Sequence, residues 1–486
     1  MTWPGWSAGP ISLCLTGLKV FPASGFKSSL TKYTMQQVFD EKTGAEKWVR
    51  TKVVVDAHLV VPELDPEMEF PDQYLEDYVS NLTRTTLDMS KPLWEMHILN
   101  LKSSEAAATA VLRIHHSLGD GASLMSLVLA CARKTSDPNS PPTVPERRLA
   151  TWKRSGLVPV LGILWAVIRL LWHTFLGILV FLATAAFLKD TGTPLMGTEG
   201  VEHRPKRVVH RTLSLDDMKA VKNATDSTIN DVLLGITAAG LSRYLRRQYG
   251  KDKATDNGKH SLPANIRLRA AVLVNIRPTP KIEALSDLME GAKTDIEWGN
   301  RLGYVVVPFV LNWTEDPLDH IRRAKEIADK KKHSLEAAFT YWSGCFIVKF
   351  FGIKAGAAIC RRMLKNTTLS FSNVAGPREE VSFYGHPLVY LAPTVCGHPH
   401  AWSTGSPELN LEALNGTCIP TSTAACMRLY MYNLQALTIH FQSYMNKMKM
   451  VVAVDENAIP DPHQLLDDVT DCLKIIKDAA EGKASL

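Results

Sequence analysis

No Cys-x-x-Cys pair occurs in this sequence, although eight cysteines are scattered from Cys14 to Cys472. That spacing excludes a zinc-finger-like cluster and predicts reduced, mostly buried thiols in a protein that faces the cytosol. A dense run of Lys and Arg interleaved with aromatic residues is also absent, and the formal net charge is only +6, so we expect no nucleic-acid partner. The first 25 residues lack a basic leader and a continuous apolar core, so we expect no cleaved signal peptide.

The chain is long enough for two domains, and its composition is that of a globular protein. It has 486 residues, of which 45% are hydrophobic and 21% are charged, so each of two domains could bury a core of its own. The predicted strands and helices follow one another in mixed order rather than in strict alternation. This order favours the α/β or α+β class with mixed sheets.

The most informative segment runs from His115 to Gly121 and reads His-His-Ser-Leu-Gly-Asp-Gly. An apolar run over residues 110–114 precedes it and predicts a buried strand, and an amphipathic stretch over 124–131 predicts a helix. A histidine at such a corner can be held with its pKa near neutrality, as a general base requires. Neighbouring strand residues point to opposite faces, so only one histidine can face a cavity. We expect that residue to be His116, with His115 packing inward.

Asp120 lies in the tight turn between two glycines, and we expect it to hold the loop by pairing with a buried cation. Two other interpretations remain open. If the segment were helical, His116 and Asp120 would form half of a metal site, although glycines on both sides of the aspartate argue against a helix. The two histidines could also be ordinary core residues with satisfied hydrogen bonds. We expect no metal.

A long apolar run over residues 156–188 is interrupted by Arg169. An arginine at the bilayer centre costs about 2.5–3.5 kcal/mol, so a spanning helix would begin after it, from Leu170 to Leu188, and reach about 28 Å. The alternative is a buried core helix. A single crossing would put the two halves of the chain on opposite sides of the membrane. If both halves build one site, a helix embedded in one leaflet or a re-entrant segment fits better.

The histidine segment resembles the His-His-x-x-x-Asp-Gly motif of the CoA-dependent acyltransferase superfamily. Other motifs are similar to those of the plant branch of the wax ester synthase/diacylglycerol acyltransferase family, and the resemblance extends from about Trp48 to the C terminus. These motifs are Pro92-Leu-Trp-Glu, Asn230-Asp-Val-Leu-Leu, Val274-Asn-Ile-Arg277 and Ser372-Asn-Val-Ala-Gly-Pro377.

The resemblance implies a two-domain fold similar to that of chloramphenicol acetyltransferase, with a tunnel between the domains and His116 at their interface as the proton acceptor. It implies that Arg277 pairs with Asp120 and that Asn230 and Asp231 begin a helix near the channel. The segment from Thr228 to Asp231 also fits a helix-capping box, and both interpretations can hold.

The same resemblance implies acyl-CoA as co-substrate, a fatty alcohol or diacylglycerol as acceptor, membrane lipid as a partner and no bound cofactor. A tetrahedral intermediate needs a hydrogen-bond donor for its oxyanion. Asn275 and a backbone amide near Gly121 are the candidates.

We expect an irregular segment over residues 1–30, an N-terminal acyltransferase domain over 31–150, the membrane segment over 156–188 and a C-terminal domain over 205–486. Two segments depart from the family pattern. Residues 1–30 do not resemble the strand and helix with which the family opens, and residues 401–435 look like an insertion. Either departure could leave a folded but inactive protein.

The expected activity is therefore transfer of a fatty acyl group from acyl-CoA to a long-chain alcohol or diacylglycerol. The expected location is a membrane, that of the endoplasmic reticulum and also the plasma membrane, with the catalytic domains facing the cytosol. A catalytically inactive, membrane-bound lipid-binding or interaction protein of the same fold is the alternative. A related acyltransferase acting on amines or soluble alcohols is a third possibility, which the apolar run disfavours.

Overall fold

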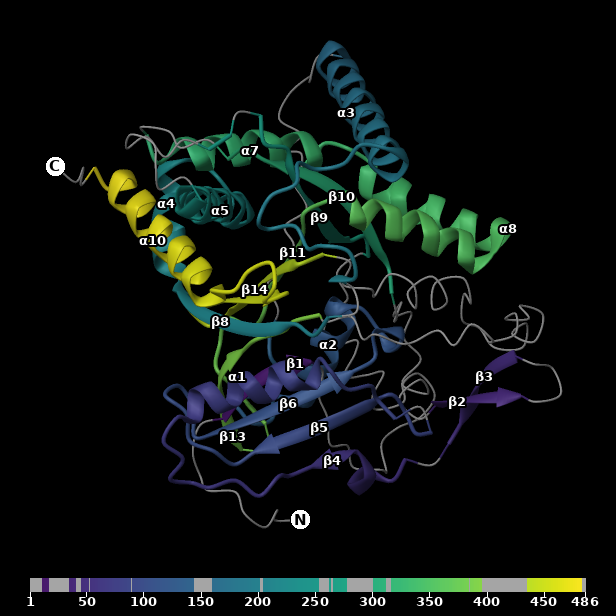
Figure 1. Cartoon of the computed structure of the whole chain (residues 1–486), viewed down its shortest axis with the longest axis vertical. Coiled ribbons are helices and arrows are strands. Elements are labelled where there is room, and N and C mark those ends of the chain that lie inside the picture. Colours follow the sequence, from purple (N-terminus) through teal and green to yellow (C-terminus); the bar gives the residue numbers. More distant parts are fainter. Residues whose placement is uncertain are drawn as a thin grey trace.

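The computed structural model of the chain contains two domains, each built on a mixed sheet, and they lie one above the other in Figure 1. This arrangement confirms the expected mixed α/β, two-domain fold. The structure describes residues 11–16, 35–40, 45–51, 53–88, 90–143, 160–201, 204–252, 262–263, 265–277, 300–311, 316–383, 385–395 and 435–482.

The first domain is a seven-stranded sheet with the strand order β4-β5-β6-β1-β13-β12-β7. Its strands are β1 (Ile11–Thr16), β4 (Leu59–Val60), β5 (Trp94–Leu99), β6 (Ala108–Ile114), β7 (Arg133–Lys134), β12 (Val381–Phe383) and β13 (His386–Leu391). Helices α1 (Pro71–Leu82) and α2 (Gly121–Cys131) pack on it, and a separate hairpin pairs β2 (Met35–Asp40) with β3 (Ala45–Arg50).

The burial of β6 on both faces explains why residues 110–112 are apolar at successive positions. Ala110 and Leu112 lie in a core that includes residues of α2, whereas Val111 lies in a second core with residues of α1. Since both faces of β6 are buried, successive positions such as 110, 111 and 112 all favour an apolar side chain. The second core also contains Val208 and Val451 of the second domain, so α1 covers a face of the first sheet and also contacts the second domain (Figure 1).

The second domain is a six-stranded sheet with the order β10-β9-β11-β14-β15-β8. Its strands are β8 (Arg207–Ser214), β9 (Leu268–Asn275), β10 (Leu302–Phe309), β11 (Leu369–Val374), β14 (Leu437–Tyr444) and β15 (Lys447–Val454). A large core joins this sheet to helices α4 (Leu215–Ala224), α5 (Ile229–Asp252), α7 (Asp319–Lys332) and α10 (Pro462–Ala480).

Two expectations about the domain ranges are wrong. Residues 1–30 are not irregular throughout, because β1 lies inside the first sheet between β6 and β13 and runs parallel to both. The segment Ile-Ser-Leu-Cys-Leu-Thr alternates apolar residues as a strand does, but Trp, Gly and Pro on either side masked this pattern. Strands β12 and β13, which fall in the expected C-terminal domain 205–486, also belong to the first sheet.

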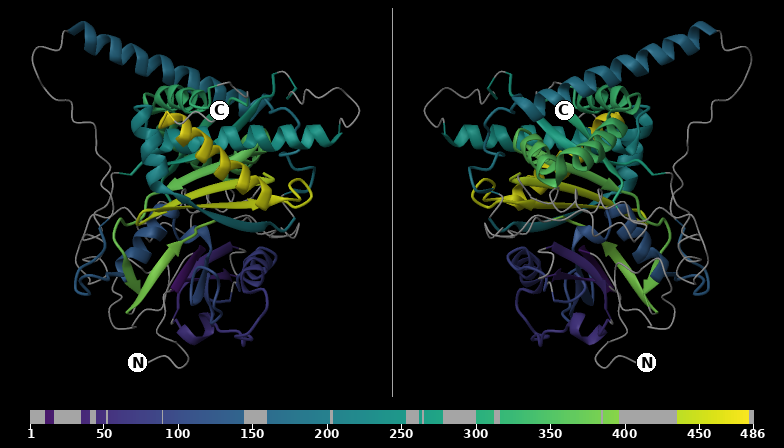
Figure 2. Two further views of the ribbon diagram at one scale, coloured as in Figure 1. Left: turned by 90° about the vertical axis from the view of Figure 1, so that its left-hand side faces the viewer. Right: turned by 90° about the vertical axis from the view of Figure 1, so that its right-hand side faces the viewer.

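Helix α3 (Val160–Ala186) lies within the apolar run 156–188 and projects beyond the second domain (Figure 2). It begins before Arg169 and therefore extends beyond the expected spanning stretch from Leu170 to Leu188, which stays a prediction. Among the described residues it is the one helix long and apolar enough to cross a membrane. Only 6% of its most apolar window is buried, which contradicts the buried core helix.

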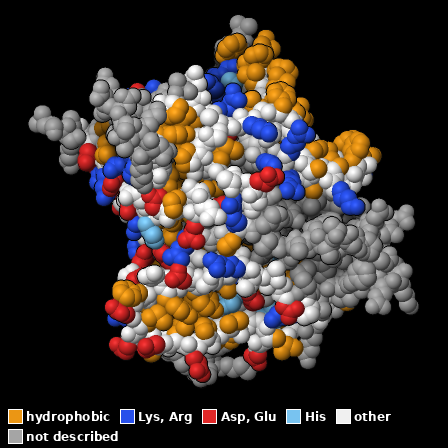
Figure 3. Space-filling model, in the orientation of Figure 1, with side chains coloured by type: hydrophobic (Ala, Val, Ile, Leu, Met, Phe, Trp, Pro, Cys, Tyr) orange, Lys and Arg blue, Asp and Glu red, His pale blue; other side chains and the backbone are white. Residues whose placement is uncertain are grey.

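Helix α8 (Glu336–Lys365), which the sequence analysis did not predict, packs beside α3 and bends at Gly352, where φ is +79°. Side chains of both helices add to the apolar areas at the upper right of Figure 3. The expected insertion over residues 401–435 lies outside the described residues apart from its last residue.

Candidate active site

Both histidines of the motif lie at the corner between β6 and α2, as expected, although neither is in the strand itself. The strand ends at Ile114, and the His115 amide extends the ladder by donating to the Leu93 carbonyl at 2.9 Å. His116 then begins a short 3₁₀ turn, and α2 starts at Gly121. Both residues are partly exposed, so neither burial nor strand alternation distinguishes the two rings.

His116 is partly exposed, and its Nδ1 is covered yet has no hydrogen-bond partner among the described residues. The side-chain amide of Asn300 donates to the His116 carbonyl oxygen at 2.9 Å, which ties the turn to the second domain. Burial lowers the pKa of His116 below its ordinary value, and the negative charge of Asp120 opposes this shift. The ring is therefore neutral at pH 7 and can accept a proton.

Asp120 is fully buried and links the two domains. Its carboxylate accepts two hydrogen bonds from the Arg277 guanidinium, at 3.0 and 2.6 Å, and one each from the amides of Ser123 and Arg301, at 3.0 and 2.9 Å. Burial alone would raise the pKa of Asp120, but Arg277 and the two amides hold it below its ordinary value.

The expected buried cation is thus Arg277, which lies just beyond the end of β9. As N-cap of α2, Asp120 precedes the helix, so the segment from His116 to Asp120 is not α-helical. This geometry contradicts the metal half-site, which required both residues on one helix. Among the described residues, no group of three or more His, Cys, Asp or Glu side chains could hold a metal ion.

The two groups expected to bind the oxyanion, the Asn275 side chain and a backbone amide near Gly121, lie close to the contact between Asp120 and Arg277. Asn275 Oδ1 accepts from the Arg277 amide at 3.0 Å, so this side chain shapes the turn that carries the arginine. Gly121 faces the second domain, because a Cβ there would lie 3.9 Å from Val374 Cγ2. An oxyanion role for either group stays a prediction.

Asn230 and Asp231 lie at the start of α5. The Asp231 carboxylate accepts from the Thr228 amide at 2.8 Å and Thr228 Oγ1 accepts from the Asp231 amide at 3.3 Å, which confirms the capping box. Lys332 Nζ lies 2.9 Å from the same carboxylate. Asn230 Oδ1 accepts from Asn373 Nδ2 at 2.6 Å and so joins α5 to the end of β11. The channel role of both residues stays a prediction.

Sequence reasoning missed three residues of this site, Asn300, Arg301 and His440. The first two precede β10, and they hold the carbonyl of His116 and the carboxylate of Asp120. His440 lies in β14, and a charge on His116 lowers its pKa further. The residues of β14 alternate between an apolar face and a polar face. A strand whose polar face meets solvent shows the same alternation, so the pattern did not indicate that His440 lies in a site.

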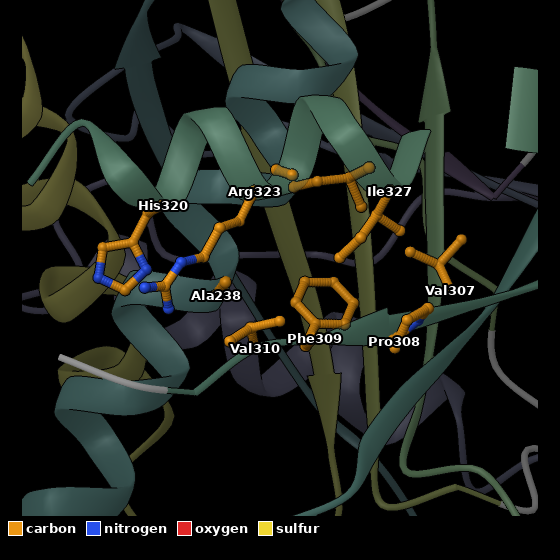
Figure 4. A pocket seen from close by; sticks show the side chains of 10 residues that line it. Ala238, Val307, Pro308, Phe309, Val310, His320, Arg323 and Ile327 are labelled. Carbon is orange, nitrogen blue, oxygen red and sulfur yellow. The ribbon is translucent and has the colours of Figure 1, made fainter. Parts of the chain in front are cut away.

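A recess elsewhere holds none of the expected site residues. It lies between α5, α7 and β10, and Figure 4 shows His320, Arg323 and Ile327 of α7 on one side with Phe309 and Val310 on the other. The recess is therefore separate from the corner that carries His116.

Two family models match this chain. The wax ester synthase/diacylglycerol acyltransferase catalytic domain matches residues 67–233, and the WS/DGAT C-terminal domain matches 298–405 and 424–477. The unmatched residues 406–423 fall inside the expected insertion.

Curated relatives and a solved structure agree with these matches. Wax ester synthase/diacylglycerol acyltransferase 11 of Arabidopsis thaliana is 48% identical, over 89% of this chain and 82% of the relative. Number 6 of the same plant is 44% identical, over 94% and 85%. The solved wax ester synthase/diacylglycerol acyltransferase from Marinobacter aquaeolei VT8 shares the fold with a TM-score of 0.50 at 15% identity, over 93% of this chain and 86% of that one. The resemblance is thereby confirmed, and the chain belongs to the wax ester synthase/diacylglycerol acyltransferase family of acyl-CoA-dependent acyltransferases.

Proposed function

We propose that this protein transfers a fatty acyl group from acyl-CoA to the hydroxyl of a long-chain alcohol or of diacylglycerol, with His116 as the general base. The observation that carries this proposal is the partly exposed imidazole of His116, whose Nδ1 has no partner among the described residues and whose pKa is lowered by burial. The corner that holds the ring is fixed from the second domain by Asn300 and by the contact between Asp120 and Arg277.

The mechanism follows from these contacts. His116 accepts the proton of the acceptor hydroxyl as its oxygen attacks the thioester carbonyl. The tetrahedral intermediate then collapses, the carbon–sulfur bond breaks, and the imidazolium returns the proton to the departing CoA thiolate. Asp120 remains charged throughout, since its partners are Arg277 and two backbone amides. It therefore positions the turn without exchanging a proton.

The test is ester formation by membranes that contain the protein, given labelled acyl-CoA and either a fatty alcohol or diacylglycerol. General-base assistance is worth about 10²–10⁴ in rate, so His116→Ala should lower the rate at least a hundredfold. His463→Gln, at an exposed histidine of α10, should leave it unchanged. Equal yields from wild type and His116→Ala would remove His116 from the mechanism. Substrate binding without turnover by the wild type would favour the inactive lipid-binding protein.

We also propose that α3 lies in one leaflet of a membrane without crossing it. Residues before α3 form strands β5 and β6, and residues after it form β12 and β13 of the same sheet. Both halves must therefore lie on one side of the bilayer. The C-terminal end of α3 is fixed to the second domain, because Arg269 donates to the Leu188 carbonyl and pairs with Asp190.

The membrane-facing surface includes α8 as well as α3. Gly177 of α3 lies against Glu336 at the start of α8, because a Cβ there would be 2.5 Å from the carboxylate. The large exposed apolar side chains of the two helices are Ile163, Leu164, Trp165, Val167, Ile168, Leu171, Trp172, Phe175, Leu176, Leu179 and Leu182 of α3, and Trp342, Phe346, Phe350, Phe351 and Ile359 of α8. Apolar areas of this size mark membrane or protein contacts.

Topology tags test this arrangement. An epitope tag at Asn139 and another at Gly200 flank α3, and both should be reached by protease from the cytosolic face of endoplasmic reticulum or plasma membrane vesicles. Tags on opposite faces would contradict the one-leaflet arrangement. Phe346→Ser with Phe350→Ser should weaken sedimentation with membranes, whereas exchange of the exposed Phe70 in the first domain should not.

A further inference from the structure

His440 lies on the face of the second sheet that meets the first domain. In β14, Leu437, Ile439 and Phe441 belong to the core of the second domain, so alternation turns His440 to the opposite face. Tyr444 shares that face, packs in the core of the first domain and donates to the Leu388 carbonyl at 2.9 Å. The face is therefore an interdomain surface.

Three observations bring His440 next to His116. The pKa of His440 is lowered to about 4, first by burial and then by the positive charge that His116 carries when it is protonated, so the two rings lie near each other. In the parallel pair of β11 and β14, Ser372 faces His440 and Val374 faces Gln442. Val374 in turn borders Gly121. His440 therefore lies on the strand next to β11, level with Ser372, and Ser372 is two residues before the valine that touches the corner holding His116.

His440 also has an unmet hydrogen-bonding capacity. The residue is only 7% exposed, and its Nε2 is buried with no partner among the described residues. The same holds for Oε1 of Gln442, its neighbour on this face, and for Oδ1 of Asn300, whose amide holds the His116 carbonyl. Buried polar atoms without partners are rare in native proteins, and a bound substrate can supply the missing hydrogen bond.

We propose that His440 is a second catalytic histidine, which donates a hydrogen bond from Nε2 to the thioester carbonyl oxygen as that oxygen becomes negatively charged. The proposal rests on the acyl transfer proposed above. A ring that stays neutral at physiological pH carries one N–H and can donate it, while it is too weak a base to compete with His116 for the hydroxyl proton. No covalent step is added, because His440 binds the oxyanion and releases it when the carbon–sulfur bond breaks.

His210 provides a matched control. It faces Val451, and Val451 faces His440, so the two histidines share one row of the same sheet about 10 Å apart. Its pKa is also lowered to about 4, by burial and by Lys449. Its ring, however, packs against Tyr390, and Lys449 Nζ lies 3.4 Å from its Nδ1.

The test compares kcat and KM of His440→Ala, His440→Gln and His210→Gln in membranes, together with thermal unfolding of each protein. Loss of one oxyanion donor lowers kcat by about 10²–10³-fold. We expect this loss in His440→Ala with KM for both substrates changed less than threefold. His440→Gln, which keeps an N–H donor, should recover at least tenfold of the loss, and His210→Gln should stay within threefold of wild type.

Several outcomes would overturn the proposal. These are a kcat of His440→Ala within threefold of wild type, a change confined to KM, and a loss that His440→Gln does not relieve although the protein unfolds at the wild-type temperature. An equal loss in His210→Gln would indicate a structural role. If instead His116→Ala retains wild-type activity, the general-base role proposed for His116 fails, and if the wild type forms no ester, the proposed acyl transfer fails. The comparison therefore separates these cases from a failure of the role of His440.

Discussion

Asp120→Ala should destabilise the protein far more than removal of an exposed ion pair. The side chains of Asp120 and Arg277 are 0% and 4% exposed, so the substitution leaves a buried guanidinium without its carboxylate. Breaking a buried pair in this way costs about 3–5 kcal/mol. By contrast, Arg322 and Asp316 form a pair that is 55% and 45% exposed, and exposed pairs contribute about 0–1 kcal/mol.

The assay is urea unfolding of the purified protein in detergent micelles. Arg322→Ala is the control, because it breaks an exposed pair that also joins an arginine to an aspartate. The double variant Asp120→Ala with Arg277→Ala should lose less stability than the sum of the two single variants, because neither buried charge is then left alone. A free-energy loss in Asp120→Ala no larger than that in Arg322→Ala would refute the reasoning. So would strict additivity in the double variant.

Three further outcomes follow from the structure. Ester formation should rise with pH and reach half its maximum below about pH 6.5, because protonated His116 cannot accept a proton and its pKa is lowered; a pH–rate profile centred above that value would contradict this. Gly303→Ala should lower the unfolding temperature measurably, since a Cβ would overlap the Ala337 carbonyl oxygen where β10 meets α8, and unchanged unfolding would count against that contact. Thr228→Ala removes the cap partner of Asp231 and should cost about 1 kcal/mol in urea unfolding, with no loss expected in kcat.

The strand, turn and helix around His116 could be predicted from the sequence because the residues that determine them are close together in the chain. A mostly apolar run, two glycines and an amphipathic stretch lie within about two dozen residues, and each predicts its own element. The contact between Asp120 and Arg277 spans 157 residues and came from the family resemblance rather than from spacing. Nothing in the local pattern around Asn300 or His440 indicated that they meet the same turn.

The parts that sequence reasoning missed depend on tertiary pairing. Strand β1 has the right alternation, but its place between β6 and β13 is set by strands from distant parts of the chain. Helix α8 carries apolar side chains on several sides, since part of it packs on β10 and α3 while Trp342 and Phe346 are exposed. Such a segment lacks the single apolar stripe that marks a helix at the surface of a globular core.

The place of β13 has a consequence for the order in which the chain folds during synthesis. Ile11 pairs with Leu388, so β1 leaves the ribosome long before its partner strand β13 has been synthesised. Until then β1 has one open edge, which is a template for wrong pairing. Closing so long a loop is slow. A nascent chain stopped before residue 380 lacks β12 and β13 and should therefore bind chaperones, whereas a chain that includes β13 can pair the open edge of β1.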